Sequence, residues 1–212
     1  ESILNQTFKD FEFIIIDDGS TDRSKEIILS FKDPRIKLVS RENRGLTKSL
    51  NEAIKQSVGT YIARMDADDI SEPDRFEKQI NFLETNPEVY LCGTWARSID
   101  ESGAILGELK YPPQTSDEIK KYLIRHNPFI HSTVIFKKEL VDKVGFYDEK
   151  FLYIEDYELW TRVVPKFKTV NIAEFLLRYR KTEAGVTRQK KLSMRLKGVF
   201  VRILAVFRLM ML

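Results

Sequence analysis

Two clusters of acidic residues, each placed just after a short apolar run, constrain this chain more than any other feature. Asp17-Asp18-Gly19-Ser20 follows Ile14-Ile15-Ile16, and Asp66-Ala67-Asp68-Asp69 lies just beyond Tyr61-Ile62-Ala63. If both runs are strands of one parallel sheet, the clusters share its carboxyl edge, where open α/β sheets bind ligands. Carboxylates gathered there repel one another at neutral pH unless a divalent cation or hydrogen-bond donors lie among them. The pattern therefore predicts a ligand site at this edge.

Composition excludes several classes of protein. The 212 residues, 42% of them hydrophobic, are enough for one sizeable core. The 35 basic and 32 acidic residues give a net charge of +3, which is not the one-signed field of a nucleic-acid-binding protein. A single cysteine, Cys92, excludes an internal disulfide and a cysteine metal cage, and it fits a reducing cytosol. The chain does not open with a basic stretch and an apolar core, so we expect no secretory signal and a cytoplasmic protein.

The spacing of apolar residues predicts alternating strands and helices over the first hundred residues. Residues 1–7 resemble the last turns of a helix, and the segment from residue 127 onward is more irregular. We expect strands at 11–17, 36–39, 61–65, 89–95 and 132–136, a hairpin at 99–109, and helices at 22–33, 46–57, 73–86, 116–125, 138–144 and from 155.

Five segments together carry a resemblance to a known family. They are Asn5-Gln6-Thr7-Phe8, Ile16 to Asp22, Asn43-Arg44-Gly45-Leu46, Asp66 to Asp69, and Glu155 to Trp160. In this order and spacing the chain resembles the family 2 glycosyltransferases, which are sugar-nucleotide-dependent, inverting enzymes. The resemblance implies a GT-A-like (Rossmann-like) α/β fold with a mostly parallel sheet flanked by helices. It also implies a nucleotide-sugar-binding half at 1–110 and a smaller acceptor-binding half at 111–188.

Family members usually begin with an apolar strand ahead of the helix that ends near Thr7. This sequence lacks such a strand. Because that strand normally lies inside the sheet, its absence would expose unpaired backbone groups on two neighbouring strands. We therefore expect either a fragment of a longer protein or a fold that closes in another way.

On the donor side, the resemblance places Asp17 and Asp18 against the nucleobase and ribose of a uridine-type donor. The alternative is that this segment, which has good turn and helix-start chemistry, only caps a loop. Arg44 and Lys48 flank a helix start, where cations and backbone N–H groups favour phosphate. Arg64 could reach the diphosphate or pair with the acidic cluster. For these three basic residues, a structural or solvated ion pair is an equally open interpretation.

Asp66 and Asp68 fit the family's DxD motif, which implies that they bind Mn²⁺ or Mg²⁺ together with the ribose or a metal-bound water. Asp68 is the preferred ligand, and Asp69 would support the pair. Hard carboxylate oxygens suit these ions. An EF-hand loop is excluded, because Ile70 and Ser71 stand where that loop needs an acidic residue and glycine.

Glu155 and Asp156 are the family's candidates for the catalytic base, and Asp156 is preferred. The alternative role for Asp156 is helix capping. His131 could line the sugar pocket, assist the metal, or be a buried structural histidine. A zinc hydrolase is disfavoured, because the two histidines, His126 and His131, form no paired ligand motif.

The tail at 189–212 carries basic residues among apolar ones and is predicted to form a basic amphipathic helix. It is too short and too charged to cross a bilayer. It could lie on an anionic membrane, at the inner face of the cell membrane, or pack on the rest of the chain or on another copy.

The sequence thus favours a metal-dependent, inverting glycosyltransferase of hexosyl or hexosaminyl type. It would transfer a sugar from a nucleotide-diphosphate sugar, preferably a UDP-sugar, to a glycan or lipid-linked acceptor in cell-surface polysaccharide synthesis. Two alternatives stay open: a noncatalytic sugar-nucleotide-binding or assembly module, and a metal-dependent nucleotidyl or phosphoryl transferase. The second is weakened by the lack of a GxxxxGK[ST] phosphate loop.

Overall fold

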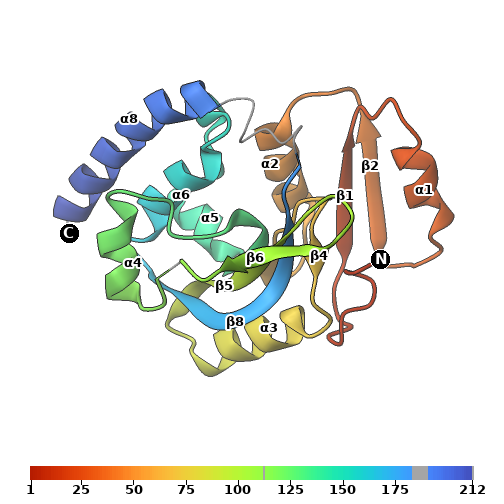
Figure 1. Ribbon diagram of the computed structural model, residues 1–212, viewed down its shortest axis with the longest axis horizontal. Helices are drawn as coiled ribbons and strands as arrows, with labels where there is room; N and C mark the ends of the chain where they lie inside the picture. The colour runs from red at the N-terminus through yellow and green to blue at the C-terminus, as the bar shows by residue number, and fades with distance from the viewer. Residues whose placement is uncertain (112, 183–190, 212) are drawn as a thin grey trace.

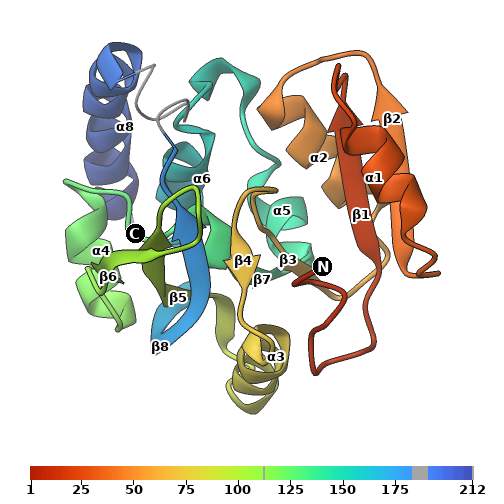
Figure 2. The same cartoon turned by 45° about the vertical axis from the view of Figure 1, so that its right-hand side comes forward.

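Strands and helices form an α/β fold with helices packed around two sheets (Figures 1 and 2). The computed structural model describes residues 1–111, 113–182 and 191–211, without the side chains of 191–196. The strands are β1 (Phe13–Asp18), β2 (Ile36–Arg41), β3 (Tyr61–Ala63), β4 (Ile70–Ser71), β5 (Val89–Ile99), β6 (Ile105–Leu109), β7 (Ile135–Lys137) and β8 (Lys168–Arg180). The α-helices are α1 (Ser24–Ser30), α2 (Leu46–Gln56), α3 (Arg75–Thr85), α4 (Ser116–Leu123), α5 (Glu139–Val144), α6 (Glu155–Val163) and α8 (Lys191–Met210), and 3-10 turns are η1 (His131–Thr133) and η2 (Glu149–Phe151).

The two acidic clusters follow strands of different sheets, which corrects the expectation of one mostly parallel sheet. Strand β1 pairs in parallel with β2 in a two-stranded sheet. The larger sheet has the order β3-β7-β5-β8-β4 with β6 on β5, and it is mixed, since only the β5–β8 pair is parallel. Among the described residues, β1 pairs only with β2, and β3 only with β7.

Strand β8 crosses the middle of the larger sheet and was not expected from the sequence. It runs parallel to β5 along most of its length. The β5–β8 register shifts between Thr94 and Trp95 and again between Trp95 and Ala96. Such bulges break the strict alternation of inward and outward side chains by which a strand is recognised. The irregular pattern of β8 therefore follows from its bulged pairing.

Two other segments are less regular than the sequence predicts. In residues 1–7 the Asn5 N–H donates to the carbonyl of Glu1, which is the i→i−4 spacing of an α-helix, so the expected helix end is present as a single turn and not as a regular helix. The strand expected at 132–136 begins as the 3-10 turn η1 and becomes extended only in β7. In the other predicted elements the type agrees and the ends differ by a few residues; α2, expected at 46–57, spans Leu46–Gln56.

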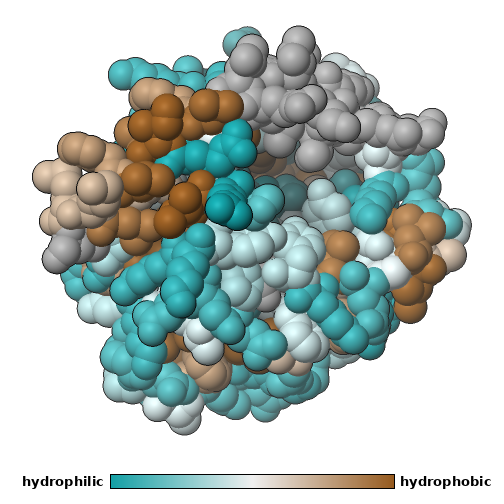
Figure 3. Space-filling view, turned by 60° about the vertical axis from the view of Figure 1, so that its left-hand side comes forward, coloured by the Kyte–Doolittle hydropathy of each residue, from teal (hydrophilic) through white to brown (hydrophobic). Residues whose placement is uncertain are grey.

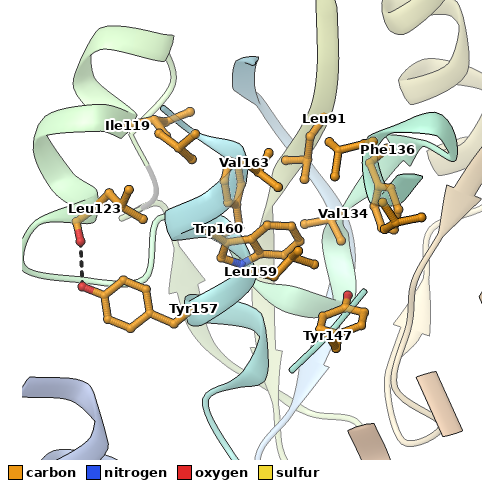
Figure 4. Packing of buried hydrophobic residues seen from close by; sticks show 14 of the residues in the cluster. Leu91, Ile119, Leu123, Val134, Phe136, Tyr147, Tyr157, Leu159, Trp160 and Val163 are labelled. Atoms are coloured by element: carbon orange, nitrogen blue, oxygen red, sulfur yellow. Dashed lines mark hydrogen bonds between the residues drawn. The ribbon is translucent and has the colours of Figure 1, made fainter. Parts of the chain in front are cut away.

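The main core lies between α6 and the sheet and is centred on Trp160 (Figure 4). Trp160 and Leu159 are fully buried against side chains from β5, β7 and α4. At the edge of this core the Tyr157 hydroxyl donates to the Leu123 carbonyl over 2.7 Å. Packing from several elements fixes α6, so the residues at its first turn have a defined position. Cys92 is buried in β5, and burial raises the pKa of its thiol to about 12.

Helix α8 packs along α6 and α4 at the outside of the molecule (Figure 1). Val201 and Ala205 point into the main core and are fully buried. The prediction of a C-terminal helix is confirmed for the described residues, and one of its faces packs on the rest of the chain. None of the helices in the described part of the chain has the length and apolarity needed to span a bilayer.

Candidate functional site

The Asp17 carboxylate closes the turn that follows β1. Its Oδ1 accepts the Ser20 N–H over 3.0 Å and its Oδ2 accepts the Ser40 hydroxyl over 2.8 Å. The hydroxyl and N–H of Ser20, together with the hydroxyl of Ser40, lower the pKa of Asp17. Asp17 therefore performs the loop-capping role that was the alternative to nucleotide binding. A carboxylate retains further lone pairs, so one role does not preclude the other.

Asp18, at the end of β1, binds the backbone of the two residues directly before α2. Its oxygens accept the backbone N–H groups of Arg44 and Gly45, both over 2.8 Å, and the guanidinium of Arg41. Burial alone would raise the pKa of Asp18, but these three donors outweigh it and the pKa is lowered. Arg41 also pairs with Glu52 on α2 over 2.7 Å. The carboxylate is thus ionised and rigidly held.

Glycine is required where this turn meets the next loop. Gly19 has a φ of +82°, and a Cβ at this position would lie 2.7 Å from the backbone N of Asn43. Gly45, directly before α2, has a φ of +91°. L-residues rarely adopt this left-handed conformation. The two glycines let the loops after β1 and β2 touch, and this contact lets Asp18 reach the helix start.

Arg44 and Lys48 extend into solvent at this end of α2. Arg44 is exposed, and Lys48 makes a loose 3.9 Å ion pair with Glu149 on η2. Figures 1 and 2 both show the β2–α2 loop and the segment leading into α6 at the upper end of the molecule. Both cations are accessible to an anionic ligand at the start of a helix.

The second acidic cluster is built on a buried guanidinium. Arg64 is 7% exposed, and its guanidinium donates hydrogen bonds to both oxygens of Asp66, over 2.8 and 2.5 Å. Ser132 joins the pair: its hydroxyl donates to Asp66 over 3.0 Å and accepts from Arg64 over 3.1 Å. A bidentate pair of this kind fixes both side chains. Of the two roles expected for Arg64, the structure shows the pairing with the acidic cluster.

Asp68 and Asp69 keep carboxylate oxygens without partners. The exposed Asp68 side chain accepts no hydrogen bond from the described residues. Asp69 is 5% exposed, and its Oδ1 accepts the Arg180 N–H over 2.8 Å while its Oδ2 has no partner. Burial raises the pKa of Asp69 to about 6, and the charges of Asp66 and Asp68 add to the shift.

This arrangement fits a divalent cation. One oxygen from each of Asp66, Asp68 and Asp69 lies within 4.8 Å of the other two. Carboxylate oxygens are the ligands that Mg²⁺ and Mn²⁺ prefer. The partnerless, buried Asp69 Oδ2 is costly unless a cation or proton satisfies it. Asp69, expected only to support the pair, is thus placed to be a ligand itself.

The first turn of α6 presents two more carboxylates. Asp156 accepts the Asn127 side-chain amide over 2.6 Å and the Tyr157 N–H over 2.7 Å. Burial raises the pKa of Asp156; its hydrogen bonds and the charge of Arg64 oppose the shift. Glu155 is 4% exposed with a partnerless Oε2, and burial together with the charge of Asp156 raises its pKa to about 7.

Backbone strain marks the entry to α6. Tyr153, two residues before Glu155, has a φ of +73° and is the one non-glycine residue with positive φ in the described part of the chain. A bulky residue in this conformation carries a cost of about 1–3 kcal/mol, and such residues cluster at active sites. The strain supports a functional role for the start of α6.

His131 is a neutral ring packed against Tyr147 and Trp160. Its Nε2 is 2.8 Å from the Tyr147 hydroxyl, and its ring meets Trp160 edge-on at 6.1 Å. Burial, together with the nearby charge of Arg64, lowers the pKa of His131 well below its usual value. It is therefore no cationic phosphate ligand, and its contacts match the structural interpretation.

Hydrogen bonds join α2 to the segment that leads into α6. Asn51 on α2 exchanges two hydrogen bonds with the backbone of Tyr147, over 2.9 and 3.0 Å. Tyr147 contacts His131, and the charge of Arg64 acts on Tyr147, His131 and Asp156. The charge of Arg64, which binds Asp66, therefore also acts on Asp156 at the start of α6.

Several residues that position this site, through a side chain or a backbone N–H, were not singled out from the sequence. They are Arg41, Ser132, Asn127, Arg180 and Arg75. Arg75 is fully buried, donates to the Arg64 carbonyl over 2.9 Å, and has a pKa lowered to about 10 by burial. Nothing in the local pattern marks these residues, because each acts on a partner distant in sequence.

Comparison with known proteins shows the family to which the chain belongs. Residues 1–145 match the profile of glycosyl transferase family 2. The O-antigen biosynthesis glycosyltransferase WbnJ of Escherichia coli is 40% identical over 188 residues, which cover 85% of this chain and 72% of that protein.

Solved structures share the fold at low sequence identity. S. aureus TarS 1-349 in complex with UDP-GlcNAc has a TM-score of 0.72 and 18% identity, covering 87% of this chain and 54% of that one. Mannosyltransferase PcManGT from Pyrobaculum calidifontis, in complex with GDP-Man and Mn²⁺, has a TM-score of 0.70 and 16% identity, covering 98% and 58%. The chain spans little more than half of either protein. It belongs to glycosyl transferase family 2 and has the GT-A-like α/β fold.

Proposed function

We propose that this chain holds the donor site and catalytic base of a metal-dependent, inverting glycosyltransferase that uses a nucleotide-diphosphate sugar, preferably a UDP-sugar. The observation that carries the proposal is the convergence of Asp66, Asp68 and Asp69, which includes a buried oxygen without a partner. The same guanidinium, Arg64, binds Asp66 and acts electrostatically on Asp156.

On the donor side, Asp68, Asp69 and Asp66 would hold Mn²⁺ or Mg²⁺. When bound, such an ion stabilises the negative charge that develops on the diphosphate leaving group. Asp18 keeps the start of α2 rigid, and the exposed Arg44 and Lys48 offer cations there for the diphosphate. A UDP-GlcNAc complex and a GDP-Man complex with Mn²⁺ among the structural neighbours support a nucleotide sugar as donor.

On the acceptor side, Asp156 removes the proton of the acceptor hydroxyl as its oxygen attacks the anomeric carbon. The bond from that carbon to the diphosphate oxygen breaks, the nucleotide diphosphate leaves, and the configuration inverts. Burial raises the pKa of Asp156 and makes it a stronger base than an exposed aspartate. The Asn127 amide holds the carboxylate in place. Glu155, with a pKa raised to about 7, is protonated during part of the physiological range and suits a supporting role.

The division into a donor half at 1–110 and an acceptor half at 111–188 belongs to this proposal. So does a glycan or lipid-linked acceptor at the cytoplasmic face of the membrane. Its support is the similarity to an O-antigen biosynthesis glycosyltransferase. The start of α6 lies in the second half and the acidic loop in the first, so the reaction would take place where the halves meet.

A donor panel tests the proposal. The full protein is incubated with UDP-, GDP- and dTDP-sugars, with Mn²⁺, Mg²⁺ or EDTA, and released nucleotide diphosphate is measured beside equilibrium binding of each donor. We expect metal-dependent binding and release with one nucleotide class. Donor binding without release in the presence of acceptor extracts would favour the noncatalytic module, and release of pyrophosphate would favour nucleotidyl transfer.

A further inference from the structure

Helix α8 has two faces of different character. Its inner face is held tightly: Val201 and Ala205 are fully buried, and Arg208 forms a 3.1 Å ion pair with Glu158 on α6. The Lys197 ammonium donates to the Leu152 carbonyl over 3.2 Å. These contacts fix the rotation of α8 about its own axis, and with it the direction in which the outer face points.

The outer face is apolar and exposed to solvent. Its side chains recur at helical spacing along one stripe, as expected for one side of an amphipathic helix. They are Val199, Phe200, Ile203, Val206, Phe207 and Met210, between 39% and 80% exposed. Figure 3 shows brown apolar surface on the side of the molecule that carries α8, interrupted by teal hydrophilic side chains. So many large apolar side chains in one exposed stripe mark an interaction surface.

We propose that this outer face of α8 lies on the surface of a bilayer containing anionic phospholipids. Lys191–Met210 contains five lysines and arginines and no aspartate or glutamate. Arg202 is exposed beside the stripe, and Lys150 is exposed on η2, where Phe151 stacks on Phe200 at 6.0 Å. Lys197 and Arg208 are bound on the inner face, so Arg202 is the described cation of α8 beside the stripe, and Lys150 stands next to the exposed Glu149. An apolar stripe on a helix with basic and no acidic residues complements a surface that is apolar inside and negatively charged outside.

A second copy of the chain is a poorer occupant of the same face. A two-fold contact places the same surface of two molecules together. The exposed Arg202 of each α8 would then approach its counterpart, with no acidic residue on Lys191–Met210 of either copy to pair with it. Like charges brought together in this way oppose association.

Vesicle co-sedimentation of the full protein tests the proposal, and no step of the test depends on sugar transfer. Vesicles of phosphatidylcholine mixed with phosphatidylglycerol are compared with phosphatidylcholine alone, at low and high salt. We expect binding to the mixed vesicles that weakens with salt. The double variant I203E/F207E should weaken it by more than about tenfold, since it removes two side chains from the apolar contact. R202Q should weaken it by about fivefold.

A matched control uses exposed apolar residues away from α8. Ile105 and Leu106 on β6 are 63% and 57% exposed, close to the 60% of both Ile203 and Phe207. I105E/L106E should therefore bind vesicles like the parent protein, and thermal melting shows whether each variant folds. The proposal is overturned if neutral and anionic vesicles bind equally or if I203E/F207E binds undiminished. It also fails if sedimentation velocity shows a dimer that this variant alone converts to monomers.

Discussion

The two groups of carboxylates in this chain differ in how completely their oxygens are satisfied. The β1 carboxylates, Asp17 and Asp18, accept hydrogen bonds on all four oxygens, and their pKa values are lowered. Asp68, Asp69 and Glu155, which we call the open carboxylates, keep at least one oxygen without a partner among the described residues. The pKa values of Asp69 and Glu155 are raised.

This contrast separates the carboxylates after β1, which hold loops together, from the open carboxylates, which can gain from a cation or a proton. Asp156 belongs to neither group, because both of its oxygens accept hydrogen bonds while burial raises its pKa. A satisfied carboxylate stabilises the fold as an anion and has little to gain from a ligand. A buried carboxylate with a free oxygen is costly in the unliganded protein, and a cation or proton relieves the cost. Carboxylates that look alike in sequence thus differ in how their oxygens are bonded, and substitutions can distinguish the two kinds.

Asp156→Asn should have the largest effect. The amide keeps the shape of the side chain and loses the basic oxygen, so transfer should fall by about 100- to 10,000-fold. Donor affinity should stay within a few-fold, because Asp156 is assigned to the acceptor. Single-turnover transfer and equilibrium donor binding measure the two effects. Parallel loss of affinity and rate would contradict the assignment.

Asp68→Ala should reduce turnover by about 100- to 1,000-fold through loss of metal-dependent stabilisation of the leaving group. Its melting temperature should be unchanged or higher, since the exposed carboxylate has no partner and repels Asp69. Calorimetric Mn²⁺ titration and thermal melting test both points. A marked loss of stability would place Asp68 with the satisfied carboxylates instead.

Asp18→Ala should show the opposite effect to Asp68→Ala, namely a loss of stability. It removes the acceptor for two backbone N–H groups and the Arg41 guanidinium, so it should lower the free energy of unfolding by about 2–3 kcal/mol. Urea unfolding measures the difference, with Asp68→Ala as the control. If both variants melt alike, hydrogen-bond satisfaction does not distinguish the two groups.

Glu155→Gln should change the pH dependence of stability. The carboxyl has a pKa of about 7 in the folded protein and 4.5 as its ordinary value. Between these values the folded state binds more protons than the unfolded state, so this group's stabilisation is complete below pH 4.5 and is lost as the pH rises through 7. The variant should therefore flatten that loss and be more stable by about 1–2 kcal/mol at pH 8.

Urea unfolding between pH 5 and 8 tests this sign, with Glu149→Gln on the exposed turn η2 as the control. A slope unchanged in Glu155→Gln but removed in Asp69→Asn would assign the effect to Asp69 alone.

Elements with regular periodicity were predictable from the sequence, and those defined by their partners were not. Helix α2 follows from Leu50 and Ile54 at helical spacing, because a helix is a local structure. The mixed order of the larger sheet and the bulged strand β8 depend on pairing between distant segments, which one strand's pattern does not encode.

The candidate site divides in the same way. The acidic residues stand out because several of them occur in short motifs, but the donors that settle their ionisation do not. Ser132 reaches Asp66 across 66 positions of sequence, and Asn127 reaches Asp156 across 29. The same applies to Arg41, which reaches Asp18 across 23 positions. Residue type was thus predictable, whereas the state of each carboxylate required the fold.

The buried carboxylate of Glu158 restricts the substitutions that this protein tolerates near α6. It binds Arg162 over 2.7 Å and Arg208 over 3.1 Å, and Arg162 also donates to the carbonyls of Val144, Gly145 and Phe146. One side chain therefore ties α6 to the turn after α5 and to α8. The losses of stability caused by substituting Arg162 and Arg208 should not be additive, because both arginines pair with the carboxylate of Glu158 and either one can still pair with it when the other is removed. During divergence these three positions are expected to change together or not at all.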